Sequence, residues 1–248
     1  MTTILIVELA GRLFDSVSEV TLRNVDASYG RHRILVDVTA HIPRSQVTAV
    51  VGANGAGKSS LLNVIAGTLA STAGTVRRAG SRRPAYVVQR SDVSDALPIT
   101  VRGTVEMGRW AHRGPWRGLT ARDHAIVEDC LTRLGIEDLA DRQLSALSGG
   151  QRQRALVAQG LAQQTELLLL DEPGTGLDLA AQTRIEEALE DARRDGMTVL
   201  RVTHDLATAR RADHCLLLHD GRLVAEGPPP TVLTPERVRS AWGVPDLV

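Results

Sequence analysis

The sequence predicts an α/β fold in which helices cover a mainly parallel sheet, and three observations support that prediction. Short apolar runs alternate with helical stretches between residues 46 and 205, which is the order of a parallel sheet. Residues 19–28 and 33–42 alternate apolar and polar side chains, so they predict an antiparallel N-terminal β subdomain. Between Ser91 and Ser145 the pattern is helical, so we expect a helical subdomain inserted into the α/β core.

The expected elements can be placed in order along the chain. Strands are predicted at residues 46–51, 74–80, 84–89, 166–173 and 197–205, and helices at 58–70 and 177–196. A hairpin over 213–227 is expected to turn at Asp220–Gly221, because Asp-Gly suits the tight turns of hairpins. In the helical stretch, Thr120 and Asp123 have the spacing of a capping box. An apolar stripe follows it at Ile126, Val127, Cys130, Leu131 and Leu134, and the tail predicts a Pro-Pro-Pro turn and one short helix near 235–242.

The composition is that of a globular protein. With 248 residues and a formal net charge of +0, the chain can bury a sizeable core and has no basic surface typical of nucleic-acid binding. We therefore expect no nucleic-acid partner. No run approaches the roughly 18 apolar residues of a membrane helix, and residues 1–14 lack the features of a signal peptide. Cys130 and Cys215 are expected to be buried free thiols of a cytosolic protein.

The strongest motif is a glycine loop that contains the only lysine among 29 basic residues. Gly52, Gly57, Lys58 and Ser59 match the phosphate-binding loop pattern G-x-x-x-x-G-K-[ST], between a predicted strand and a predicted helix. A compact ammonium suits a tight loop around phosphates, where the wide guanidinium of arginine does not. The loop predicts a P-loop NTPase core, and the alternative is a chance lysine in an arginine-rich chain.

Two acidic residues follow the apolar run that precedes Pro173. Asp171 is expected to hold Mg²⁺ together with the hydroxyl of Ser59. Its neighbour Glu172 can orient or deprotonate an attacking water. The alternative is an acidic strand exit without a catalytic role.

The stretch LSGGQ predicts a second anion site. Ser148 is expected to cap a helix whose first turn, at Gly149 and Gly150, has no side chains. A helix N-terminus favours an anion, because its N–H groups and partial positive charge point at the ligand. The alternative is a plain loop before a helix.

The four motifs GANGAGKSS, LSGGQ, LLLLDEP and VTHD occur in the order found in one family of proteins. From about residue 20 to 227, the chain resembles the ATP-binding cassette (ABC) family of transporter ATPases. The expected domains are therefore an unassigned extension at 1–19, an ABC ATPase domain at 20–227 and a tail at 228–248. The helical subdomain is expected at about 91–155.

The resemblance implies roles for individual residues toward ATP and Mg²⁺. Glu172 would be the general base, and His204 would contact the γ-phosphate. Tyr29 would stack on adenine, although a strand-end tyrosine without that role is the alternative. The implied nucleotide-binding set is Tyr29, Gly52, Ala53, Asn54, Gly55, Ala56, Gly57, Lys58, Ser59, Ser60 and Gln89, and the implied magnesium ligands are Ser59, Gln89 and Asp171.

The resemblance also implies that two chains share each site. The signature residues Ser148, Gly149, Gly150 and Gln151 would close the nucleotide site of a partner subunit in a homodimer. Asp178 would lie in the loop that crosses between subunits, and Gly174 in that loop is expected to loosen it. His214 and His219 lie five residues apart on one predicted strand, so we expect opposite faces and a structural role instead of a metal site.

The expected partners are separate transmembrane permease subunits and an extracytoplasmic substrate-binding protein. The ATPase would then be cytoplasmic and peripheral on the inner face of the membrane. Residues 97–110 resemble a segment of zinc and manganese importer ATPases, which favours import of zinc or manganese. Two alternatives stay open: an iron-siderophore or haem importer, and a soluble ABC ATPase of iron–sulfur assembly, translation or repair.

Overall fold

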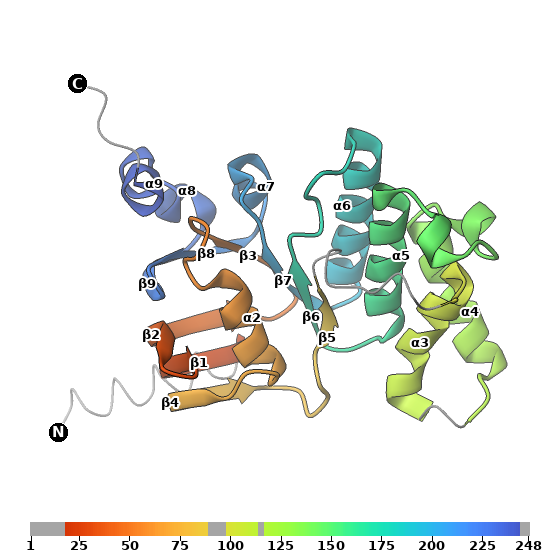
Figure 1. Cartoon of the computed structure of the whole chain (residues 1–248), viewed down its shortest axis with the longest axis horizontal. Helices are drawn as coiled ribbons and strands as arrows, with labels where there is room; N and C mark the ends of the chain where they lie inside the picture. Colours follow the sequence, from red (N-terminus) through yellow and green to blue (C-terminus); the bar gives the residue numbers. More distant parts are fainter. Residues whose placement is uncertain (1–17, 89–97, 114–116, 244–248) are drawn as a thin grey trace. The chain divides into compact units, whose positions relative to one another are not determined.

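The computed structural model describes residues 18–88, 98–113 and 117–243, which fold into two compact units (Figure 1). The first unit comprises the chain up to Arg83 together with the part from Thr198 onward, and the second comprises Pro84–Met197. Both units combine parallel strands with helices, so the predicted α/β class is confirmed. Nearly all of the predicted extension at 1–19 lies outside the described residues.

The first unit contains the predicted antiparallel sheet, with the strand order β2-β1-β4. Its strands are β1 (Ser18–Tyr29), β2 (His32–Pro43) and β4 (Ser71–Arg78). The pairing of β4 with β1 is interrupted by a bulge after Arg23, and β4 approaches β1 closely there at Gly74. This glycine has a φ of +78°, and a Cβ atom there would lie 2.2 Å from the carbonyl oxygen of Asn24.

The same unit contains four strands in the order β7-β3-β8-β9. They are β7 (Thr198–Val202), β3 (Val47–Val51), β8 (His214–His219) and β9 (Arg222–Gly227). β3 pairs in parallel with both β7 and β8, whereas β9 pairs antiparallel with β8. The predicted hairpin turn is confirmed, because Asp220 and Gly221 have φ angles of +45° and +74°.

Helix α2 (Lys58–Ala66) follows β3 and is shorter than the predicted 58–70. Gly67 ends it in a left-handed conformation with a φ of +79°, and its N–H group bonds to the carbonyl oxygens of Asn63 and Val64. This is the usual end of a helix at glycine, which has no Cβ atom to oppose that backbone. The predicted extension of the helix to residue 70 was therefore wrong.

Among its described residues, the first unit has three further helices, α7 (Leu206–Arg210), α8 (Pro229–Val232) and α9 (Pro235–Trp242). The prolines predicted as a turn begin the short helix α8, since proline is tolerated at the first position of a helix. Val232, Leu233 and Ala241 pack in one buried cluster with Val51 and Leu217 of the sheet. The C-terminal helices therefore belong to the core of this unit.

The second unit pairs β5 (Ala85–Val87) in parallel with β6 (Leu167–Asp171). Its helices are α3 (Val101–Arg113), α4 (Ala121–Arg133), α5 (Gly149–Ala162) and α6 (Leu179–Arg194), with 3₁₀ turns η2 (Glu137–Leu139) and η3 (Leu144–Ala146). The helical subdomain at about 91–155 stays a prediction, because this unit also contains β5, β6 and α6.

Local signals on α4 are confirmed. Thr120 accepts a hydrogen bond from the N–H group of Asp123, and Asp123 accepts one from Thr120 in return, which is a complete capping box. Four residues of the predicted apolar stripe are buried, and Ile126 is half-buried. Since α3 also packs on α4 and α5, these helices form one layer of the unit (Figure 1).

One buried contact network joins α3 to both neighbouring helices. Arg109 pairs with Asp123 of α4, and its Nη1 atom donates to the carbonyl oxygen of Ala162 at 2.6 Å. A Cβ atom on Gly108 would lie 2.4 Å from the carbonyl oxygen of Gln159, so the approach of α3 to α5 needs glycine. Within the described ranges, no helix is both long and apolar enough to cross a lipid bilayer.

Candidate functional site

The glycine loop at 52–57 connects β3 to α2, as the motif requires. Gly52 has a φ of +151°, and a Cβ atom there would lie 2.2 Å from the carbonyl oxygen of Leu218. Lys58 is the first residue of α2, and its side chain returns over the loop. Its Nζ atom donates to the carbonyl oxygens of Gly52 and Ala53, both at 2.9 Å. The Lys58 residue is 6% exposed, so the loop holds a buried positive charge.

The N-terminus of α2 adds to this positive potential. Gly57 caps the helix without a side-chain hydrogen bond, and the first turn contains no acidic residue. Because no side chain caps this nine-residue helix, its N-terminus presents N–H groups and a partial positive charge to an anion. Together with the ammonium of Lys58, this geometry suits a chain of phosphates.

The turn of the β8–β9 hairpin, which lies far from the phosphate loop in the sequence, is hydrogen-bonded to that loop. The N–H group of Gly221 donates to the carbonyl oxygen of Ala56 at 3.2 Å, and its own carbonyl accepts from Val36 at 2.9 Å. A Cβ atom on Gly221 would lie 2.2 Å from the carbonyl oxygen of Ile34. Only glycine therefore fits at this turn beside the loop.

Tyr29 and His204 also belong to the first unit. Tyr29 is the last residue of β1 and is 51% exposed. Its hydroxyl accepts a 3.3 Å hydrogen bond from the side chain of Asn63 in α2. His204 is exposed in the turn between β7 and α7. The structure thus connects Tyr29 to the helix that follows the phosphate loop.

Asp205 fixes the turn that contains His204, and the sequence analysis assigned it no role. Its carboxylate caps α7 by accepting from the N–H groups of Ala207 and Thr208, each at 3.0 Å. The hydroxyl of Thr208, followed by these backbone bonds, holds the pKa of Asp205 below its usual value. An aspartate directly before a helical pattern is the local signal that could have predicted this cap.

The second unit contains the acidic pair. Asp171 ends β6 with 7% exposure, and Glu172 follows it half-buried. Glu172 has a φ of +48°, a left-handed conformation that is uncommon outside glycine. Its Oε2 atom accepts a 2.9 Å hydrogen bond from the hydroxyl of Thr175.

Ser148 caps α5, as predicted, and Gln151 completes a capping box that the prediction did not include. Its hydroxyl accepts from the N–H group of Gln151 at 3.3 Å, and the side chain of Gln151 accepts from the N–H group of Ser148 at 3.0 Å. The spacing S-x-x-Q is the sequence signal of this capping box. Gly149 and Gly150 follow the cap and are both half-buried, so the first turn of α5 begins with two residues that have no side chain.

The loop between β6 and α6 is held by hydrogen bonds at the N-terminal end of α6. Asp178 caps α6 by accepting from the N–H group of Ala181 at 2.8 Å. The side chain of Gln182 donates to the carbonyl oxygens of Gly174 and Leu177, at 3.2 and 3.1 Å. These bonds oppose the loosening that the sequence predicts for Gly174.

The donors expected for Mg²⁺ have suitable chemistry. Ser59 offers an exposed hydroxyl in the first turn of α2, and Asp171 offers a carboxylate at a strand end. Hydroxyl and carboxylate oxygens are ligands that Mg²⁺ prefers. Gln89, the third predicted ligand, lies outside the described residues.

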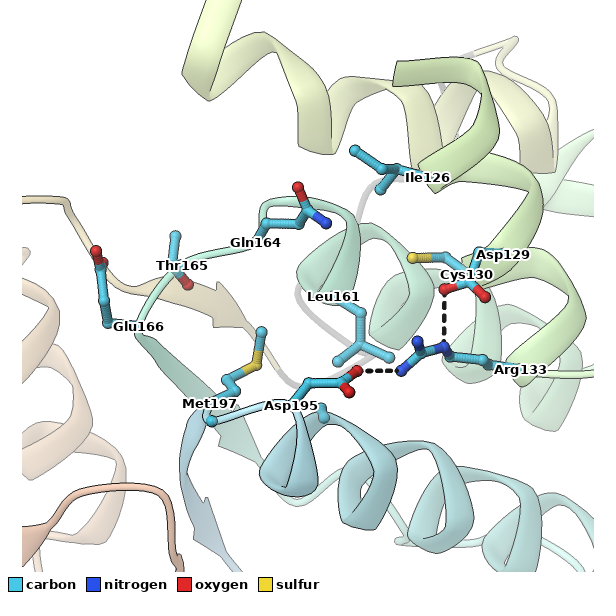
Figure 2. A pocket seen from close by; sticks show the side chains of 12 residues that line it. Ile126, Asp129, Cys130, Arg133, Leu161, Gln164, Thr165, Glu166, Asp195 and Met197 are labelled. Carbon is cyan, nitrogen blue, oxygen red and sulfur yellow. Dashed lines mark hydrogen bonds and ion pairs between the residues drawn. The ribbon is translucent and has the colours of Figure 1, made fainter. Parts of the chain in front are cut away.

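A cavity of about 290 Å³ lies in the second unit among α4, α5 and α6 (Figure 2). Arg133 spans it, paired with Asp129 at 2.8 Å and with Asp195 at 2.9 Å. Burial raises the pKa of Cys130, which lines the same cavity, to about 12. None of the predicted nucleotide-site residues that the structure describes lines this cavity.

The two histidines of β8 have separate partners. His214 contacts Glu226 at 3.3 Å, and His219 contacts the carbonyl oxygen of Ala241 at 3.0 Å. In the part of the chain that the structure describes, no group of three or more potential ligands could hold a metal ion. The structural role predicted for both histidines agrees with these contacts.

Comparison with known proteins gives the context for these motifs. The family model described as "ABC transporter" matches residues 35–175. The chain is 42% identical over 231 residues to the cobalamin import ATP-binding protein BtuD of Halobacterium salinarum. That alignment covers 88% of this chain but 57% of BtuD, so the chain spans little more than half the length of that relative.

Two other relatives match over most of their own length. The manganese transport system ATP-binding protein MntB of Halalkalibacterium halodurans is 34% identical, with 90% of this chain and 91% of MntB covered. The zinc transport system ATP-binding protein TroB of Treponema pallidum is 37% identical, with 90% and 86% covered. A solved metal-chelate type ABC transporter in an inward-facing conformation superposes with a TM-score of 0.81 at 28% identity, covering 92% of this chain and 90% of that one.

Proposed function

The chain belongs to the ABC transporter family, and from that premise we propose that it is the ATP-hydrolysing subunit of a membrane importer. The observation that carries the proposal is the phosphate loop, in which the only lysine of the chain places a buried ammonium beside an uncapped helix N-terminus. A nucleoside triphosphate brings negatively charged phosphates that suit this ammonium and helix N-terminus. The exposed ring of Tyr29, bonded to α2, provides a surface on which adenine stacks.

Different residues of the proposed site have different roles in ATP hydrolysis. Lys58 and the N–H groups of the loop bind the β- and γ-phosphates, and Ser59 and Asp171 hold Mg²⁺. When bound, Mg²⁺ neutralises charge on the phosphate oxygens. Glu172 accepts the proton of the attacking water, and His204 contacts the γ-phosphate, where negative charge accumulates in the transition state.

The second half of each site comes from another copy of the chain. Ser148 caps α5, and Gly149 and Gly150 leave the N-terminal turn of that helix open to an approaching phosphate. Pairing two chains head to tail brings this turn to the nucleotide of the partner. The proposed assembly is therefore a homodimer on the cytoplasmic side of permease subunits, with an extracytoplasmic substrate-binding protein.

The proposed cargo is zinc or manganese. MntB and TroB, which match over most of their length, are named for these metals. Import of a metal chelate such as a ferric siderophore is the second candidate, because BtuD is named for cobalamin, which is a cobalt chelate, and the superposed transporter is of the metal-chelate type. Uptake assays in cells that produce this chain together with its permease subunits, using zinc, manganese and ferric siderophore, distinguish the two.

The test of the ATPase proposal is Glu172→Gln, which keeps the shape of the side chain and removes the base. The variant is expected to bind ATP and to form a stable dimer with very slow turnover. Size-exclusion chromatography with ATP and Mg²⁺ measures this, and Lys58→Ala is the control that stays monomeric. A Glu172→Gln protein that elutes as a monomer with saturating ATP contradicts the proposal.

A further inference from the structure

We propose that Thr175 is a positioning residue that holds the carboxylate of the general base Glu172 in place. The inference rests on the proposed function, because it assigns a role in ATP hydrolysis. Its starting point is a single contact: the Oγ1 atom of Thr175 donates to Oε2 of Glu172 at 2.9 Å. This distance lies within the ordinary range of O–H···O hydrogen bonds.

The backbone of Glu172 explains why the carboxylate lies within reach of Thr175. Its φ of +48° turns the chain sharply after β6, and the N–H group of Thr175 donates to the carbonyl oxygen of Glu172 at 3.3 Å. A non-glycine residue persists in this conformation only where its surroundings determine it. The turn thus brings the side chains of two residues three positions apart to the same place.

The position of Thr175 is fixed from α6. The side chain of Gln182 bonds to the carbonyl oxygens of Gly174 and Leu177, which lie on either side of Thr175 in the sequence. Asp178 then begins the helix as its cap. These bonds tie the loop that contains Thr175 to helix α6. The hydrogen bond from Thr175 then restricts the orientation of the Glu172 carboxylate.

The contact leaves the base able to act. A carboxylate has about four acceptor sites on its two oxygens, and the hydroxyl of Thr175 occupies one of them. This one hydrogen bond therefore does not by itself prevent the carboxylate from accepting a proton from water. Restricting the carboxylate matters because a displacement of about 1 Å at a reacting group can cost up to roughly a hundred-fold in rate.

Thr175 has little to contribute to stability. The residue is exposed and lies between Gly174 and Gly176, in a loop outside the core. Replacing it by valine keeps the shape and removes the donor. Surface substitutions of this kind usually change stability little, so an effect on catalysis would come from the lost contact with Glu172.

The experiment measures steady-state ATP hydrolysis by the full-length dimer. Thr175→Val is expected to lower kcat about ten-fold while KM and ATP affinity stay within about two-fold, and Thr175→Ser, which keeps the donor, is expected to restore most of the rate. Thr183→Val is the matched control, because its hydroxyl is also exposed and bonds to the carbonyl oxygen of Leu179 instead. This control is expected to match the parent protein.

A double variant separates positioning from a structural role. If Thr175 acts through Glu172, adding Thr175→Val to Glu172→Gln lowers the residual rate no further. A Thr175→Val protein with the parent kcat, or one with a raised KM and a lowered melting temperature, overturns the inference while the ATPase proposal stands. A parent protein without ATPase activity, whose Glu172→Gln variant also fails to dimerise, overturns both.

Discussion

Arg109 and Asp123 form a buried ion pair, with Nε of Arg109 3.0 Å from Oδ1 of Asp123 and both side chains no more than 6% exposed. The pair joins α3 to α4. Asp123 also completes the capping box with Thr120, so one carboxylate has two structural roles.

Removing one partner of this pair is expected to destabilise the protein strongly. Arg109→Met leaves the carboxylate of Asp123 buried without its counter-charge, and such changes cost about 3–5 kcal/mol in the free energy of unfolding. Urea unfolding measures the effect. Arg102→Met is the control, because Arg102 also connects α3 to α4 but pairs with the more exposed Glu128. We expect about 0–1 kcal/mol for that control, and equal losses in the two variants would contradict the assignment.

Lys58→Arg is expected to weaken ATP binding several-fold or more, although it conserves charge. The buried ammonium occupies a position 2.9 Å from two loop carbonyls, where a planar guanidinium has no room. Titration with a fluorescent ATP analogue measures the affinity. Arg33→Lys, at an exposed pair with Asp26, is the charge-conserving control and should leave the affinity unchanged. If the Lys58→Arg variant binds the ATP analogue as tightly as the parent protein, lysine is not specifically required at this position.

Both cysteines are expected to be unreactive in the folded protein. Burial raises the pKa of Cys130 and of Cys215 to about 12, so the neutral thiol predominates at pH 8 and the nucleophilic thiolate is scarce. A thiol reagent that gives a coloured product should therefore react slowly with the native protein and label two thiols after denaturation. Rapid labelling of the native chain at pH 8 would show that one of the thiols is accessible.

Cross-linking tests whether two chains share a site. Cysteines replace Ser148 and Ala53 in a Glu172→Gln protein whose native cysteines are alanines. A covalent dimer is expected on a non-reducing gel only when ATP is present, and Lys58→Ala should abolish it. Cross-links confined to one chain would identify a self-contained P-loop ATPase instead.

The sequence predicted features that depend on near neighbours. The capping box of Thr120 and Asp123, the cap at Ser148 and the hairpin at Asp220–Gly221 each need only a few adjacent residues, and all three are present. The end of α2 at Gly67 could have been predicted from the same kind of signal, because glycine commonly ends a helix.

Features that depend on packing between distant segments were not predicted. The pairing of Arg109 with Asp123 follows from how α3 and α4 pack, and no local pattern specifies it. The left-handed backbone of Glu172 also has no sequence signal, since this conformation is adopted mostly by glycine and, less often, by asparagine and aspartate. The candidate site was predicted by motif, whereas the contacts that hold its side chains required the structure.

The hydrogen bond from Gly221 to the carbonyl oxygen of Ala56 has a consequence for biosynthesis. The ribosome makes the phosphate loop early and delivers Gly221 only 165 residues after Ala56, at roughly 5–20 residues per second. Until then the loop lacks one of the contacts that hold it. A nascent chain stalled before the β8–β9 hairpin should therefore retain ATP more weakly than the released protein, so nucleotide binding matures late in translation.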